Sequence, residues 1–227
     1  MADDQQAARW FGVLFIITFI TSIAALALFQ SVLDDPAAYI SGDGKDNQIY
    51  LGAFLEFLLV LANVGTAVVL YPIARRQNEY LAIGYVAARI IESVFIAVGV
   101  IFMLGVVSLR MDSPDAGDLA VSLAALKDWT FLFGPGFIVP FGNGLILGYL
   151  MYKSGLVPRR MTYLGLIGGP LLLVGSIGTL FDWWNAGTTV PAILVIPEFF
   201  WELSLGIYAA VWGFRKDAPI LSARTAG

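Results

Sequence analysis

The stretch Gly84–Glu92 reads GYVAARIIE and places two charged residues inside a long apolar run, Tyr80–Leu109. This run exceeds the roughly 20 residues that cross a bilayer as a helix. Arg89 would lie about 13 Å below the start of such a helix, where an unpaired charge costs on the order of 3 kcal/mol. Glu92 follows three residues later, so both side chains share one helix face. The stretch therefore predicts membrane helices packed around a polar core.

The composition is that of a membrane protein. Hydrophobic residues make up 59% and charged residues 13% of the 227 residues, and the mean hydropathy is +0.80. Soluble domains carry about 25% charged residues. The formal net charge of -4 is too small to suggest nucleic acid as a partner, and membrane lipid is the expected one. The chain has no Cys and no His, so we expect no metal and no cofactor.

Six apolar runs are each near or above the spanning length, which predicts an all-α, polytopic bundle forming a single membrane domain over residues 1–227. The expected helices are Trp10–Phe29, Tyr50–Ala74, Tyr80–Leu109, Trp129–Tyr152, Met161–Phe181 and Pro191–Phe214. The first run should be retained, not cleaved as a signal peptide, because Asp3 and Asp4 oppose Arg9. The polar segment Asp217–Gly227 is predicted to be a flexible tail.

Basic residues predict the orientation, because loops on the cytoplasmic side are rich in Lys and Arg. If six helices alternate, nine basic residues fall on one side and three on the other. This predicts cytoplasmic termini in the cell inner (plasma) membrane. The nine are Arg9, Arg75, Arg76, Lys153, Arg159, Arg160, Arg215, Lys216 and Arg224, and the three are Lys45, Arg110 and Lys127.

Three further carboxylates interrupt other apolar runs, and their depths overlap those of Arg89 and Glu92. Such residues should point inward and not toward lipid. Asn63 shares a helix face with Glu56, the first of these carboxylates. The candidate polar core comprises Arg89, Glu92, Glu56, Glu198, Glu202, Asn63, Asn143 and Tyr85.

The core holds more acid than base, because one Arg cannot neutralise four carboxylates. At least two carboxyl groups are then expected to be protonated, or to hold a cation or an amine. The alternative is a purely structural network, in which protonated glutamates join the helices by hydrogen bonds and Arg89 is the central strut.

The fourth run is broken by glycine and proline between Gly134 and Gly144. Proline removes a backbone donor, so this helix should be irregular. The irregularity is either a packing kink or a place where freed carbonyls and Asn143 line the polar core. Spaced glycines, Gly144 with Gly148 and Gly165 with Gly169, allow close packing within the bundle or against a second copy in a homo-oligomer.

Three functions from different classes remain open. The first is a membrane protein that binds or moves a small molecule, a proton or a cation, with a lipophilic or cationic ligand. The second is an intramembrane enzyme that acts on a lipid or isoprenoid with a glutamate as general acid. The third is a structural or accessory subunit. The lack of His and Cys weakens the enzyme hypothesis.

Three segments resemble a known bacterial family of integral membrane proteins, the domain of unknown function 4386. They are GYVAARIIE at residues 84–92, YLMYKSGLVPR at residues 149–159 and ELSLG at residues 202–206. The resemblance covers nearly the whole chain and implies a six-helix inner-membrane protein. It implies no activity, so any function has to be argued from the site itself.

Overall fold

A computed structural model describes residues 2–42, 44–113, 115–185 and 187–222, and these residues form helices and turns with no strand among them. Six helical segments are long and apolar enough to cross a membrane. They are Ala2–Asp34, Asp46–Ala74, Glu79–Asp112, Gly117–Ser154, Arg159–Leu180 and Thr189–Trp212. The prediction of an all-α, multi-pass membrane bundle is confirmed.

All six spans begin before their apolar runs, whereas the fifth and sixth spans end one and two residues before the predicted ends Phe181 and Phe214. In chain order the elements are α1 (Ala2–Asp34), α2 (Pro36–Ser41), α3 (Asp46–Ala74), α4 (Glu79–Asp112), α5 (Gly117–Phe131), η1 (Leu132–Ile138), η2 (Pro140–Leu147), α6 (Gly148–Ser154), α7 (Arg159–Leu180), α8 (Thr189–Trp212) and α9 (Pro219–Ser222). The helix α4 starts at a side-chain cap, since Asn78 Oδ1 accepts a hydrogen bond from the backbone N–H of Leu81 at 3.0 Å.

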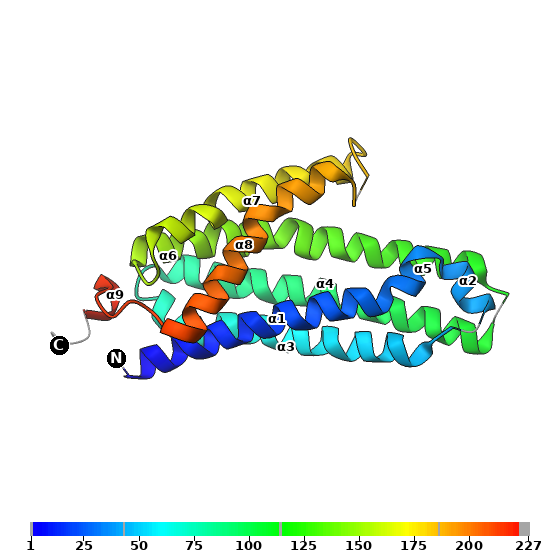
Figure 1. Cartoon of the computed structure of the whole chain (residues 1–227), viewed down its shortest axis with the longest axis horizontal. Coiled ribbons are helices and arrows are strands. Elements are labelled where there is room, and N and C mark those ends of the chain that lie inside the picture. Colours follow the sequence, from blue (N-terminus) through cyan, green and yellow to red (C-terminus); the bar gives the residue numbers. More distant parts are fainter. Residues whose placement is uncertain (1, 43, 114, 186, 223–227) are drawn as a thin grey trace.

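The helices form two groups (Figure 1). One contains α1, α3, α4 and α5, and the other is the antiparallel pair α7 and α8, which packs on η2 and crosses α1. The crossing is close because the backbone of Gly12 on α1 meets that of Ala209 and Ala210 on α8, leaving no room for a Cβ. From this crossing α8 leans away from α1 toward the other end of the bundle (Figure 1).

The fourth span is continuous but changes its winding in the middle. It begins as α5, becomes π-helical through η1 and η2, and ends as α6. Pro140 has no N–H to give to the carbonyl of Gly136 one turn earlier. Instead, Ser176 Oγ on α7 donates to the Gly136 oxygen at 2.6 Å. Trp201 Nε1 on α8 donates to the backbone carbonyl oxygen of Asn143 at 2.9 Å. The predicted irregularity is confirmed, and α7 and α8 supply partners for its backbone.

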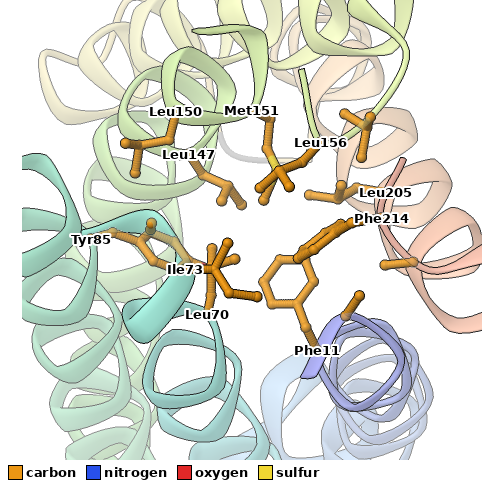
Figure 2. Packing of buried hydrophobic residues seen from close by; sticks show 14 of the residues in the cluster. Phe11, Leu70, Ile73, Tyr85, Leu147, Leu150, Met151, Leu156, Leu205 and Phe214 are labelled. Atoms are coloured by element: carbon orange, nitrogen blue, oxygen red, sulfur yellow. The ribbon is translucent and has the colours of Figure 1, made fainter. Parts of the chain in front are cut away.

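Buried apolar side chains gather in two clusters, one at each end of the bundle. The terminal cluster takes in Ala8 near the start of α1 and Ile220 on α9. It also includes Phe11, Phe15, Leu70, Ile73, Tyr85, Leu147, Leu205 and Phe214, most of which are labelled in Figure 2. The opposite cluster includes Ala25, Phe29, Ile49, Met103, Val106 and Ala120. On α3 and α4 the charged residues Glu56, Arg89 and Glu92 lie between the two clusters in sequence.

At the opposite end of the bundle, polar contacts join α2 to the start of α3 and the end of α4. Tyr39 Oη donates to Asp46 Oδ1 at 2.6 Å, and Arg110 Nη1 lies 2.6 Å from Asp46 Oδ2. Burial, and then the hydrogen bond to Asp46, raise the pKa of the Tyr39 hydroxyl above its usual range. The phenol is protonated at neutral pH, and the raised pKa keeps it donating to Asp46 in more alkaline solution as well.

The segment after α8 differs from the predicted flexible tail over its first part. Pro219–Ser222 forms the short helix α9. Ala218, Ile220 and Leu221 are buried in the terminal cluster. Their apolar side chains explain the difference, because burial removes them from water. Residues 223–227, including Arg224, lie outside the described residues.

Candidate functional site

Arg89 and Glu92 on α4 form a closed network with Asn63 on α3. Arg89 Nη1 lies 2.8 Å from Glu92 Oε2, and Arg89 Nη2 donates to Asn63 Oδ1. Asn63 Nδ2 donates to Glu92 Oε1 at 3.0 Å. The guanidinium also lies over the ring of Phe15 on α1, 5.4 Å from its centroid. All three polar residues are buried. The charge of Arg89 is therefore matched locally.

A second ion pair joins Glu56 on α3 to Lys127 on α5. Lys127 Nζ donates to both carboxyl oxygens of Glu56, at 2.8 and 2.9 Å. Both residues are buried, and the ammonium lies 5.5 Å from the centroid of the Phe29 ring.

The position of Lys127 corrects the sequence-based topology. Lys127 was assigned to an outer loop because the fourth helix was expected to begin at Trp129. The helix begins at Gly117, which puts Lys127 inside the span. The charged residues Asp118, Lys127 and Asp128 made this segment look like a loop in the sequence. In the structure the Lys127 side chain points to the carboxylate of Glu56, and this ion pair offsets the cost of removing the ammonium from water. The polar core therefore contains two bases.

Neither Glu198 nor Glu202 on α8 forms a salt bridge among the described residues, although Glu202 lies near enough to Arg89 for their charges to attract. Glu202 Oε1 accepts a hydrogen bond from Asn143 Nδ2 on η2. Glu198 is 1% exposed, and neither of its carboxyl oxygens has a hydrogen-bond partner in the described part of the chain. Four residues separate the two glutamates, so they occupy one face of the helix.

Glycines explain why Glu198 is buried without a partner. A Cβ on Gly168 of α7 would come within 2.9 Å of Glu198 Oε2, and one on Gly144 within 3.1 Å. A Cβ on Gly144 would also come within 2.6 Å of the Gly169 Cα, so η2 and α7 touch through their backbones. These glycines serve packing within the bundle. They let the carboxyl group approach the helices while offering it no side-chain donor.

One cavity of about 330 Å³ connects most of these groups. Its charged and amide lining is Asn63, Arg89, Glu92, Glu56, Lys127, Glu198 and Glu202, and Thr18, Ser22 and Thr130 add hydroxyl groups. Its apolar lining comes from α1, α3, α4, α5, η1, α7 and α8. The volume lies at the lower end of the range for small-molecule pockets, about 300–1,000 Å³. The two ion pairs and the two glutamates of α8 thus face one shared cavity.

Two of the predicted core residues lie beside this cavity and do not line it. Tyr85, one turn before Arg89, is buried in the terminal cluster (Figure 2). Asn143 is fully buried behind Glu202, which it holds by its amide group. Among the described residues no group of three or more acidic side chains could hold a metal ion.

A larger hollow of about 910 Å³ lies at the terminal end, between the start of α1, the end of α3 and α9. Its lining includes Asp4 and Arg76, which pair at 2.7 Å. The buried glutamates do not contribute to it, so its chemistry is separate from that of the membrane cavity.

Comparison with known proteins gives the family of the chain. A family model described as Domain of unknown function (DUF4386) matches residues 10–213. This chain belongs to the DUF4386 family. No curated protein and no solved structure matches it. The resemblance seen in the sequence is therefore confirmed, and the family description gives no activity.

The residues that carried this resemblance have defined places in the DUF4386 bundle. The Arg89 and Glu92 pair is the centre of the buried network, and Glu202 lines the cavity. Lys127 was the functional candidate that sequence reasoning missed. The signal available for it was the helical pattern of Leu119–Leu126, which allowed the fourth helix to begin earlier.

Proposed function

We propose that this DUF4386 protein binds a small molecule with a cationic group in its membrane cavity. The observation that supports the proposal is Glu198, a buried carboxyl group that faces the cavity with neither oxygen hydrogen-bonded within the described chain. A buried polar group without a partner costs free energy, which a bound donor would recover.

The distribution of charge favours a cation over an anion. Lys127 and Arg89 are each held by a carboxylate, at 2.8 Å in both cases. Glu198 and Glu202 are the acids left over. A protonated amine can donate to both, and opposite charges at a few ångströms attract strongly where water is excluded. The same acids could hold a proton when the cavity is empty, which links ligand binding to proton release.

Cyclohexylamine and its neutral analogue cyclohexanol test the proposal, because they have the same size and differ in charge. We expect the protein in lipid nanodiscs to bind cyclohexylamine more tightly, by isothermal titration calorimetry. Glu198→Gln should weaken amine binding by about 30-fold or more, since truncating one partner of a buried charge pair costs about 2–5 kcal/mol. Asp112→Asn, which changes an exposed carboxylate, is the matched control.

Equal binding of the amine and the alcohol, or amine binding that survives both Glu198→Gln and Glu202→Gln, would contradict the cation site. A loss of amine binding in the Asp112→Asn control would point to a general charge effect and would count against it as well.

We propose the cell inner membrane as the location, with both termini cytoplasmic. With Lys127 inside the span, Lys45 and Arg110 remain on the side opposite the termini, which sharpens the charge asymmetry. Because the chain has no Cys, any labelling of a single-cysteine variant comes from the introduced residue. In intact cells an impermeant maleimide should label cysteines placed at Asp115 and Asn185, and should leave those at Gln77 and Lys153 unlabelled. The reverse labelling pattern would overturn the orientation.

A further inference from the structure

The membrane cavity is closed toward both ends of the bundle and open at its side. Toward one end lies the terminal cluster, with Phe11, Leu70 and Tyr85 at most 1% exposed. Toward the other lies the opposite cluster, with Phe29, Ile49 and Met103 fully buried. Packed apolar side chains of the described residues therefore flank the cavity at both ends.

The exposed lining residues lie on α1, on α8 and, through Phe131 at 55%, on α5, which places the open side there. Lining residues there are exposed although they belong to the membrane spans, with Ile23 at 56% and Leu26 at 50% on α1, and Val195 at 38% on α8. Phe19 and Phe199 bound this opening toward the helix crossing, where their rings meet edge to face with centroids 5.2 Å apart. Beyond this contact α8 leans away from α1 (Figure 1). We call the opening formed by Ile23, Leu26, Val195 and Phe199 the mouth.

We infer that the cation is the head of an amphiphile with a single apolar chain, which enters from the bilayer through the mouth and leaves its chain there. This inference rests on the proposed function and names its class of ligand. The cavity is polar inside, at Glu198 and Glu202, and apolar at the mouth. A molecule with a cationic head and a hydrocarbon chain matches this arrangement, because its head can reach the two glutamates while its chain lies at the apolar mouth.

The energetics favour this ligand over a fully hydrated cation. A small hydrated ion would have to shed its water to pass an apolar opening at membrane depth. The chain of an amphiphile is already in hydrocarbon and loses nothing when it lies between apolar helices, because lipid tails are as apolar as those side chains. The cavity of about 330 Å³ holds the head and the first part of the chain.

The test compares butylamine with dodecylamine, which share a head and differ in chain length, on the full protein in lipid nanodiscs. The variants are Leu26→Trp and Val195→Trp, which add bulk at the mouth, and Ile101→Trp, which adds it at an exposed site on α4 outside the cavity. We expect both mouth variants to weaken dodecylamine binding by about tenfold or more, the usual size of an overpacking penalty. Butylamine binding should be weakened less than dodecylamine binding by both mouth variants, because less of the short chain lies between the mouth residues. Ile101→Trp should leave the binding of both amines within about twofold of the unchanged protein, the level expected of a surface substitution.

The outcomes separate the two proposals. If Glu198→Gln abolishes binding of both amines and the mouth variants affect them equally or not at all, access through the mouth is wrong while the cation site stands. If Ile101→Trp weakens dodecylamine binding as much as the mouth variants do, the effect is not specific and the inference is also overturned. If neither amine binds the unchanged protein, the cation site fails, and the amphiphile fails with it.

Discussion

Replacing Arg89 by glutamine is expected to lower the free energy of unfolding by about 3–5 kcal/mol, because it strands Glu92 without its counter-charge. Both residues are buried, and Asn63 provides the only other side-chain contacts to Glu92 within the described hydrogen bonds. The stranded carboxylate can recover part of the loss by taking up a proton. Unfolding in mixed micelles of sodium dodecyl sulfate and a mild detergent measures the difference.

The double change Arg89→Gln with Glu92→Gln should restore much of this stability, since both charges are then gone. Asn63 Nδ2 can still donate to an amide oxygen at position 92. If Arg89 serves as a strut, the double variant should also keep its affinity for cyclohexylamine, because Glu198 and Glu202 are unchanged. Loss of affinity in a stable double variant would place Arg89 in the binding site. A single Arg89→Gln variant as stable as the unchanged protein would contradict a buried ion pair at this position.

The spans could be predicted because their physical signal is local. A run of apolar residues longer than the bilayer is thick has few other solutions than a helix, and each of the six runs lies within an observed helix or overlaps most of one. The pairing of Arg89 with Glu92 was equally local, since a spacing of three residues on a helix already puts the two side chains on one face. These features need no knowledge of how the helices pack.

Partners on different helices could not be predicted in the same way. Glu56 and Asn63 share a face of α3, yet one contacts Lys127 on α5 and the other Arg89 on α4. The position of a residue along its helix gives only its depth in the membrane, and several possible partners on other helices lie at the same depth. Helix rotation decides among them, and it is set by packing of the glycines and the large side chains around the whole bundle.

The difference between Glu198 and Glu202 was also hidden in the sequence. Both lie on one face of α8, and both were expected to be members of one polar core. Only Glu202 meets an amide, because the π-helical winding of η2 brings Asn143 against α8. Glu198 meets glycine backbone instead. Local winding therefore decides which of two similar acids is left for a ligand.

Replacing Lys127 by methionine should also cost about 3–5 kcal/mol, because Glu56 would remain as a buried charge without a partner. The lysine and the glutamate are 6% and 8% exposed, so bulk water screens their charges little. The same assay in mixed micelles measures the loss. Lys45→Met is the matched control, since Lys45 is exposed and its removal should change stability by no more than about 0.5 kcal/mol.

The double change Lys127→Met with Glu56→Met should be close to the unchanged protein or more stable, because replacing a buried ion pair by apolar residues of similar size is often neutral or stabilising. Its affinity for cyclohexylamine should also stay within about threefold of that of the unchanged protein, since the charges of Lys127 and Glu56 cancel each other and Glu198 remains available. If Lys127→Met is as stable as Lys45→Met, the ammonium of Lys127 is solvated and Glu56 is a third free acid. The cavity would then carry more negative charge than two glutamates, and a ligand with two cationic groups would fit it better than a simple amine.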